Sequence, residues 1–381
     1  MIKLRNACGL LFLLLCTCRK PYNPPVITAK NSYLVVEGII NPGSDSTIIK
    51  LSKTVNINAA VTLNPLLGAT VTVEDNQANS WPLIADGRGG YVSPGLNLLA
   101  ARQYRLRIIA NGNQYLSDFV PVRLTPPIDS IGYKLTNNGV MIYVNAHDPA
   151  NNTRYYRWDY NETWMFHSKY YADLVVDTIH DVLVDLPYDQ QVYHCWGNDL
   201  SSTIVLDNTS KLKEDVVYQN PLTIIPYTSE KFEQEYSILV KQYALTADAF
   251  TFYQNMKKNT EQLGSIFDAQ PSQLVGNIHS LANAAEPVIG FISVTNVQSK
   301  RIFLTSDILP PNTTAIYPYD CEQDTALIGA VQGILLDRPF DFRPTIRAYD
   351  RKGNQIGVLY STPICVDCSL RGTITQPLFW K

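Results

Sequence analysis

The chain has 381 residues, which is enough for two or three domains that each bury a hydrophobic core. Hydrophobic residues make up 45% of the chain and charged residues 17%, a composition that argues against intrinsic disorder. The net charge of −3 gives no basic surface of the kind that binds nucleic acid, so we expect no nucleic-acid partner.

Residues 1–17 have the order of a lipoprotein signal peptide. Lys3 and Arg5 give a positive start, and residues 9–15 form an apolar run that is too short to span a bilayer. The end of this run, Leu15-Cys16-Thr17-Cys18, resembles a bacterial lipobox, in which a small residue precedes the lipidated cysteine. Cys18 fits that position better than Cys16, which follows a leucine; an ordinary secretory signal is the alternative. Residues 18–25 would then be a polar, proline-rich tether.

Residues 26–125 are predicted to form a first β domain. Alternating or β-branched segments at 33–38, 46–52, 69–74 and 104–109 indicate strands, and turns rich in Gly, Asn and Pro separate them. Short strands without intervening helices predict an antiparallel β-sandwich of the immunoglobulin or fibronectin type. The glycines at 87, 89 and 90 do not make a nucleotide-binding loop, because no helix follows them.

Residues 126–381 are predicted to form a second, fibronectin-like sandwich, which begins after the linker Thr125-Pro126-Pro127. Residues 156–162 would be a long strand with Trp158 on its core face, and residues 174–186 a loop and a strand. Further strands are expected at 128–131, 140–144, 193–196, 202–206, 236–245 and, returning to the same sandwich, 344–349.

A helix-containing insertion is predicted at about 246–304. Apolar residues at 249, 252, 253, 256 and 263 recur at helical spacing, Thr246 is a suitable N-cap, and Gly264 could end the helix. Strand-like segments at 288–294 and 301–304 follow. The apolar face of the helix would either seal the sheet beside it or carry a partner surface.

Four cysteines lie beyond the predicted lipid anchor at Cys18: Cys195, Cys321, Cys365 and Cys368. An even number in an exported chain predicts disulfides, and the sequence leaves the three possible pairings open. A redox pair at Cys365 and Cys368 would need a CxxC at a helix start in an α/β context, whereas this one lies in a turn-rich β segment. No histidine lies near the pair to complete a zinc site, so we predict no metal and no cofactor.

Several segments together resemble a family of Bacteroidota lipoproteins that is known as domain of unknown function 4249. The resemblance rests on the lipobox cysteine and, in order along the chain, on residues 33–38, 49–54, 68–73, 264–268, Pro271, 276–278, 365–368, Pro377 and 379–380. It implies an outer-membrane lipoprotein, usually encoded beside a TonB-dependent receptor, and it supplies no catalytic residues. The chain departs from the pattern at Arg19 and Lys20, where surface-exposed members often carry acidic residues. The resemblance therefore leaves open which side of the outer membrane the protein faces.

The sequence carries no motif that would mark an enzyme. It lacks G-x-S-x-G, H-E-x-x-H and a P-loop, and its acidic residues at 173, 177, 181, 185 and 189 do not have the spacing of a calcium loop. Each histidine (His147, His167, His180, His194 and His279) is interpreted as a surface or satisfied core residue. We therefore predict a non-catalytic envelope lipoprotein that works as a binding or accessory subunit with a TonB-dependent receptor. A structural or adhesive protein and an exported hydrolase are the alternatives.

Overall fold

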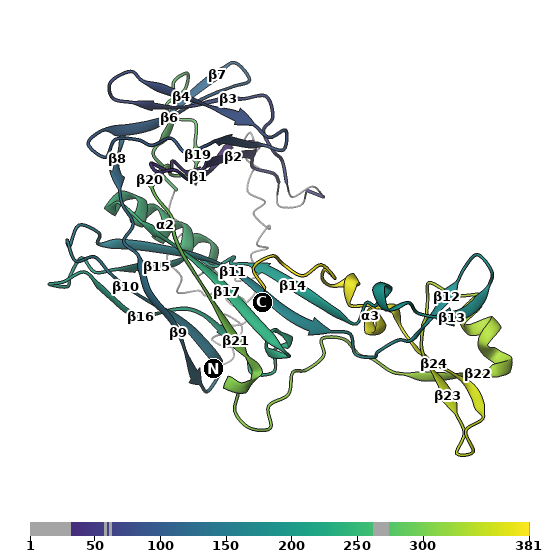
Figure 1. Cartoon of the computed structure of the whole chain (residues 1–381). Helices are drawn as coiled ribbons and strands as arrows, with labels where there is room; N and C mark the ends of the chain where they lie inside the picture. The colour runs from purple at the N-terminus through teal and green to yellow at the C-terminus, as the bar shows by residue number, and fades with distance from the viewer. Residues whose placement is uncertain (1–31, 57–58, 61–62, 262–273, 381) are drawn as a thin grey trace, which may run out of the picture.

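The computed structural model describes residues 32–56, 59–60, 63–261 and 274–380, which form two β domains and a smaller lobe (Figure 1). The first domain lies at the top of Figure 1, the second lies below it, and the distal lobe extends to the right. The predicted mainly β fold is confirmed. No helix in the described ranges is both long enough and apolar enough to cross a membrane. Cys18 and the predicted signal peptide and tether lie outside the described residues.

The first domain is a sheet folded into two layers around one core. Strand order is β18-β7-β6-β3-β4-β5-β2-β1-β19, with β8 beside β6 and β20 beside β8. The sheet turns over at β4, which pairs with β3 through Leu83 and with β5 through Ile84. Its strands are β1 (Leu34–Ile39), β2 (Thr47–Lys53), β3 (Thr70–Asp75), β4 (Ser80–Ala85), β5 (Gly90–Ser93), β6 (Gln103–Ala110), β7 (Asn113–Ser117), β8 (Val120–Arg123), β18 (Ile278–Ser280), β19 (Val288–Ile289) and β20 (Val294–Thr295).

Three of these strands come from the segment that was predicted to be an insertion in the second domain. Strand β18 pairs with β7, while β19 and β20 run parallel to β1 and β8. The side chains of Ile278, Val288, Ile292 and Val294 are buried in the first core. The predicted insertion is therefore corrected: residues 278–295 complete the first domain, although about 150 residues of chain separate them from β8. Local alternation identifies a strand but does not identify its partner.

The second domain consists of two facing sheets. One has the order β16-β10-β9, and the other has the order β14-β11-β17-β21 with β15 also paired to β11. The predicted long strand is confirmed, and Trp158 on it is fully buried between the sheets. The strands are β9 (Ile128–Thr136), β10 (Gly139–His147), β11 (Tyr155–His167), β14 (His194–Leu200), β15 (Val205–Asn208), β16 (Val216–Ile225), β17 (Glu235–Ala244) and β21 (Gln298–Thr305).

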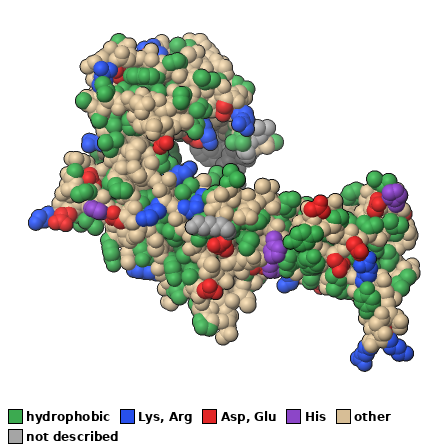
Figure 2. Space-filling view, in the orientation of Figure 1, with side chains coloured by type: hydrophobic (Ala, Val, Ile, Leu, Met, Phe, Trp, Pro, Cys, Tyr) green, Lys and Arg blue, Asp and Glu red, His purple; other side chains and the backbone are tan. Residues whose placement is uncertain are grey.

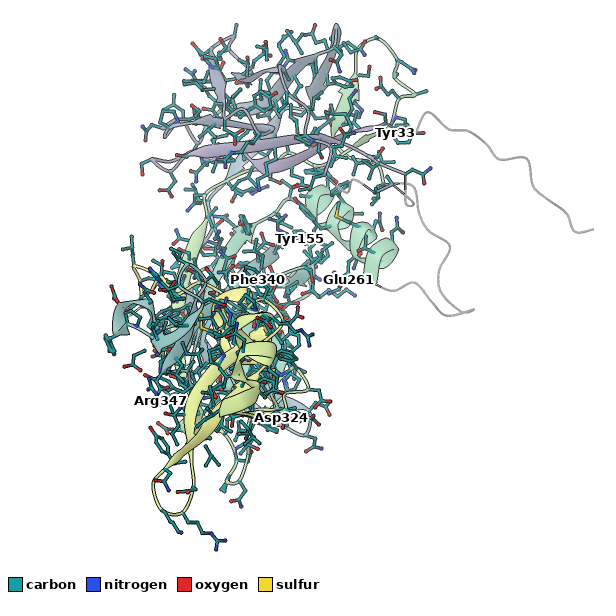
Figure 3. The ribbon with its side chains drawn as sticks, turned by 90° about the vertical axis from the view of Figure 1, so that its right-hand side faces the viewer. Tyr33, Tyr155, Glu261, Asp324, Phe340 and Arg347 are labelled. Atoms are coloured by element: carbon teal, nitrogen blue, oxygen red, sulfur yellow. A yellow bond between two sulfur atoms is a disulfide. The ribbon has the colours of Figure 1, made fainter. Side chains whose placement is uncertain are left out.

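The distal lobe has its own small core around Leu174, Ala326, Leu335 and Val358. Residues 344–349 were predicted to return to the second sandwich, and this prediction is wrong, because β23 pairs with β24 in the lobe's own sheet, β22-β24-β23. Figure 3 shows Asp324, Phe340 and Arg347 together in this lobe, away from the first domain. Its elements are β12 (Leu174–Asp177), β13 (Val182–Asp185), β22 (Asp324–Leu327), β23 (Arg343–Tyr349), β24 (Gln355–Ser361) and α3 (Pro363–Val366). Short helical turns lie at Tyr188–Gln190, Glu230–Phe232, Ser306–Ile308, Ile328–Ala330, Gln332–Leu336 and Cys368–Leu370.

Helix α2 (Ala247–Glu261) lies between the first and second domains, as Figures 1 and 3 show. The predicted N-cap is confirmed, because Thr246 Oγ1 accepts a hydrogen bond from the Ala249 amide at 3.2 Å. The predicted end at Gly264, and Leu263 before it, lie outside the described residues. Ala249 and Phe252 are buried on the helix face that was expected to be apolar, and Phe250 beside them is buried as well. The helix therefore packs between the domains, and the partner surface on it stays a prediction.

Candidate functional site: a cleft between two domains

A cleft of about 880 Å³ lies between the first and second domains. Figure 2 shows the hollow below the first domain. Three surfaces line this interdomain cleft: the outward side of β1 and β2, the outward side of β11 and β17, and one side of α2. Its volume is within the range of roughly 300–1,000 Å³ that is typical of small-molecule sites.

The first-domain wall follows from simple strand alternation. Leu34 and Val36 of β1 point into the core, so Val35, Glu37 and Ile39 point outward into the cleft. Ile48 and Lys50 do the same on β2. Glu37 lies directly opposite Lys50 in the strand register, which places one charge of each sign on an otherwise apolar wall.

The second-domain wall is built around Arg157 of β11. Its guanidinium carbon lies 4.5 Å from the ring centre of Tyr243 on β17 and 4.5 Å from that of Tyr253 on α2. Arg157 Nη2 donates to Asp159 Oδ2 at 3.0 Å. Its buried Nε has no hydrogen-bond partner among the described residues. Because only 16% of the Arg157 side chain is exposed, the two rings and the carboxylate replace most of its hydration.

Tyr243 and Arg157 on this wall have raised pKa values. Burial, followed by the negative charge of Asp159, raises the pKa of Tyr243 to about 12, so its hydroxyl stays protonated. Burial acts to lower the pKa of Arg157, but Tyr253, Asp159 and Tyr243 outweigh it and the pKa is raised. Arg157 therefore stays charged, and its positive charge is already matched by Asp159.

Helix α2 closes one side of the cleft with an aromatic and apolar surface. Phe252, Tyr253 and Met256 line the cleft from the helix, and Phe291 lies against them from the segment between β19 and β20. The Phe252 and Phe291 ring centres are 5.6 Å apart. These side chains belong to a third hydrophobic cluster, which lies at the junction of the domains and includes Tyr243 and Leu245. The lining is thus part of the packing that joins the two domains.

Buried hydrogen bonds fix the two walls relative to each other. Thr125, in the linker after β8, accepts from the Ala244 amide at 3.0 Å and donates to the Asn296 carbonyl at 2.6 Å. Its Oγ1 also lies 2.9 Å from Thr295 Oγ1. One hydroxyl therefore joins the three chain segments that meet at the domain boundary. We call Thr125, Thr295, Asn296 and Gln242 the junction cluster.

Gln242 extends this cluster into the core of the second domain. Its Nε2 donates to the Pro126 carbonyl at 2.8 Å, and its Oε1 accepts from Trp158 Nε1 at 2.8 Å. Gln242 is fully buried, so both bonds are protected from water. The linker is consequently tied to the same strand that presents Tyr243 to the cleft.

The 276–278 segment of the resemblance has a structural role beside the cleft. The Asn277 side chain donates to the Ile292 carbonyl at 2.9 Å and accepts from the Ile292 amide at 2.8 Å. A side chain at Gly276 would place its Cβ 1.9 Å from the Gly290 carbonyl oxygen. Gly290 itself has φ +146° and lies so close to Val36 that a Cβ there would be 2.2 Å from the Val36 carbonyl oxygen. These glycines let the backbone pack tightly against β1.

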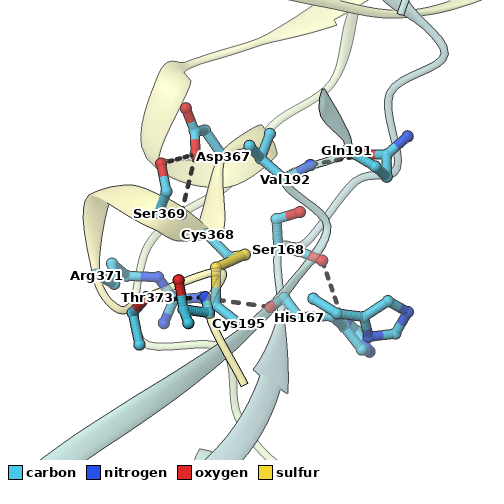
Figure 4. Close-up of a disulfide and its surroundings, with 12 residues drawn as sticks. His167, Ser168, Gln191, Val192, Cys195, Asp367, Cys368, Ser369, Arg371 and Thr373 are labelled. Carbon is cyan, nitrogen blue, oxygen red and sulfur yellow. Dashed lines mark hydrogen bonds between the residues drawn. A yellow bond between two sulfur atoms is a disulfide. The ribbon is translucent and has the colours of Figure 1, made fainter. Parts of the chain in front are cut away.

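The four predicted disulfide cysteines are paired, and none of them lines the interdomain cleft. The pairs are Cys195–Cys368 and Cys321–Cys365, so the two cysteines of the CxxC segment belong to different bridges. Figure 4 shows the first pair, near Arg371, which donates to the His167 carbonyl at 3.3 Å. Both bridges lie where the second domain meets the distal lobe and hold the C-terminal segment in place.

The histidines and the acidic run are engaged in local contacts rather than in a shared site. Four histidines (His147, His167, His180 and His279) each pair with a carboxylate. The fifth, His194, has its Nδ1 3.3 Å from Gln234 Nε2. Within the acidic run, Asp177 contacts His180 and Asp185 pairs with Arg347. No group of three or more His, Cys, Asp or Glu in the described ranges could hold a metal ion.

Together, the strand pairing, the two disulfides and the cleft define a disulfide-bonded, mainly β protein with a cavity between two domains. Residues 19–301 match a protein family that is described as a domain of unknown function (DUF4249), and the chain belongs to this family. The match ends before the distal lobe sheet and the CxxC segment, although the resemblance in the sequence extends to the last residues.

Similarity to solved structures is weak. A segment of two fibronectin type III domains from chicken tenascin is 12% identical, with a TM-score of 0.16, and the match covers 56% of this chain and 90% of that chain. A putative carbohydrate-binding protein from Bacteroides uniformis ATCC 8492 is 13% identical, with a TM-score of 0.14, and the match covers 57% of this chain and 91% of that chain. TM-scores this low carry no argument about ligand or activity. No curated protein matches the chain.

The residues of the interdomain cleft could not be identified from the sequence. Alternation places Arg157 and Asp159 on the face opposite Trp158, and it places Lys50 on the face opposite Ile49. Such residues are ordinarily exposed to solvent. Only the return of residues 278–295 to the first domain brings the two outward faces together, and no local pattern contains that information.

Proposed function

We propose that this protein is a non-catalytic, lipid-anchored subunit of the outer membrane that binds a small molecule in the interdomain cleft and works with a TonB-dependent receptor. The observation that carries the proposal is the cleft itself. It combines a suitable volume, an aromatic and apolar lining, and a few charged side chains that face one another. The junction cluster supports a preformed site, which lowers the entropic cost of binding.

Two further features support the cellular part of the proposal. The order of residues before Cys18 suits acylation of that cysteine, and more than one acyl chain is needed for stable anchoring. The two disulfides suit an oxidising compartment outside the cytoplasm. The receptor is inferred from the family resemblance, in which such lipoproteins are usually encoded beside a TonB-dependent receptor.

The test is affinity purification of the full-length lipoprotein from the membranes of the cells that produce it. Native mass spectrometry then detects bound small molecules, and peptide sequencing identifies proteins that copurify. Ile48→Trp fills the cleft from β2, where Ile48 is 48% exposed. Ile109→Trp is the matched control, because Ile109 is 43% exposed on β6 of the same domain and does not line the cleft.

We expect a bound small molecule on the wild type and on Ile109→Trp, none on Ile48→Trp, and a TonB-dependent receptor with the wild type. Because both substitutions are at exposed positions, both variants should fold. A wild-type protein that carries no small molecule and no receptor would contradict the proposal. That result would favour the structural or adhesive alternative.

A further inference from the structure

We propose that the interdomain cleft selects an amphipathic anion, namely a small molecule with a flat, ring-bearing apolar body and one carboxylate or similar anionic group. This inference rests on the proposed function, because it names the chemical class of the ligand for the same cleft.

Among the described residues, the charged side chains that line the cleft have an excess of positive charge. Three are cationic (Lys50, Arg157 and Lys241) and two are anionic (Glu37 and Asp159). Arg157 and Asp159 neutralise each other through the ion pair at 3.0 Å. That leaves two lysines facing one glutamate, and the two lysines come from opposite walls, Lys50 from β2 and Lys241 from β17.

Lys241 is the stronger anchor of the two lysines. It is half-buried, and no ion-pair partner for it is found among the described residues, although Asp159 lies opposite it in the strand register. Asp159 instead accepts from Arg157, which is held in place between the rings of Tyr243 and Tyr253. A lysine without an ion-pair partner gains a charge-assisted contact when an anionic ligand binds beside it. Lys50 is more exposed and has Glu37 opposite it.

The remaining surface is suited to a flat apolar body. Ile39 and Ile48 line the first-domain wall, and Tyr253, Met256 and Phe291 line the side formed by α2 and the segment next to it. Aromatic side chains favour flat partners through offset stacking and edge contacts. A ligand that lies between the two sheets can therefore bury its ring against these side chains while its anionic group reaches Lys241.

The test compares three probes that share one ring system and carry an anionic, a neutral or a cationic substituent: 1-naphthoate, 1-naphthylmethanol and 1-naphthylmethylammonium. Binding to the detergent-solubilised full-length protein is measured by isothermal titration calorimetry. We expect naphthoate to bind at least about 10-fold more tightly than the alcohol, and the ammonium to bind most weakly, as a single charge-assisted contact predicts.

Variants assign the selectivity to the cleft. Lys241→Gln should weaken naphthoate binding about 10-fold and leave binding of the alcohol unchanged. Lys53→Gln is the matched control, since Lys53 is on β2 but does not line the cleft, and it should bind naphthoate like the wild type. Ile48→Trp should abolish binding of both probes.

Failure of this inference can be distinguished from failure of the proposed function. If all three probes bind equally well and Ile48→Trp abolishes their binding, the cleft binds small molecules but the anionic class is wrong. If naphthoate does not bind at all, the class is also wrong, whatever molecule is found on the protein purified from membranes. The proposed function is tested separately, by that purification.

Discussion

Replacing Thr125 with valine should loosen the junction between the two domains. Valine keeps the branched shape but removes the hydroxyl, so the Asn296 carbonyl loses its 2.6 Å donor and the Ala244 amide loses its 3.0 Å acceptor. Thr125 is buried, so water cannot readily replace the lost partners. A net hydrogen bond contributes about 1 kcal/mol, and a buried amide without a partner costs about 1–3 kcal/mol. We therefore expect a loss of about 3 kcal/mol from the free energy of unfolding.

Hydrogen exchange at the Ala244 amide measures this effect at the bond itself. A local loss of about 3 kcal/mol corresponds to exchange that is more than about 100-fold faster. Thr70→Val is the matched control, because Thr70 is exposed on β3 and its side chain makes no hydrogen bond among the described residues. Exchange at Ala244 that stays within about 3-fold of the wild type, together with an unchanged urea midpoint, would refute the role given to Thr125.

Three other predictions concern the anchor, the disulfides and acid stability. Cys18→Ser should leave the protein unacylated and release it from membranes, as acyl labelling and fractionation would show; retained label would assign lipidation to another residue. Replacing Cys195 and Cys368 with alanine removes a bridge between residues 173 apart and should lower the free energy of unfolding by about 4 kcal/mol in urea titrations. Burial acts to raise the pKa of Asp75, but hydrogen bonds from Asn79, Arg102 and Gln77 outweigh it and lower the pKa to about 2. As the pH falls, the Asp75 carboxyl takes up its proton in the unfolded chain before it does so in the folded protein. The stability that Asp75 contributes is therefore present above about pH 4 and is lost as the pH falls towards 2. Asp75→Asn should make the urea midpoint depend less on pH between pH 4 and 2. An unchanged pH dependence of the midpoint would contradict the role given to Asp75.

Local sequence patterns predicted the elements better than their partners. Alternation around Trp158 correctly gave a long strand with that side chain in the core, and Thr246 was correctly identified as the helix N-cap. An even number of cysteines correctly indicated disulfides, but only the fold shows that Cys365 and Cys368 belong to different bridges. Such features depend on neighbouring residues or on composition, which a sequence displays directly.

The cleft depends on contacts between distant segments, which is why it could not be predicted. Strands β19 and β20 are two residues long and pair in parallel with β1 and β8, so neither their length nor their pattern identifies the partner. Arg157 has the sequence context of a solvent-exposed strand residue. In the fold, Tyr253, on a helix almost 100 residues later, lies against its guanidinium, and the first domain faces it across the cleft.

The central claim is that the interdomain cleft binds a small amphipathic anion, and a crystal structure of the full-length protein with 1-naphthoate tests it most directly. We predict electron density for the ring between the two sheets, against Tyr253 and Met256, with the carboxylate within hydrogen-bond distance of Lys241 Nζ. An empty cleft with the probe bound elsewhere, or a ring in the cleft with its carboxylate directed away from both Lys241 and Lys50, would contradict the claim.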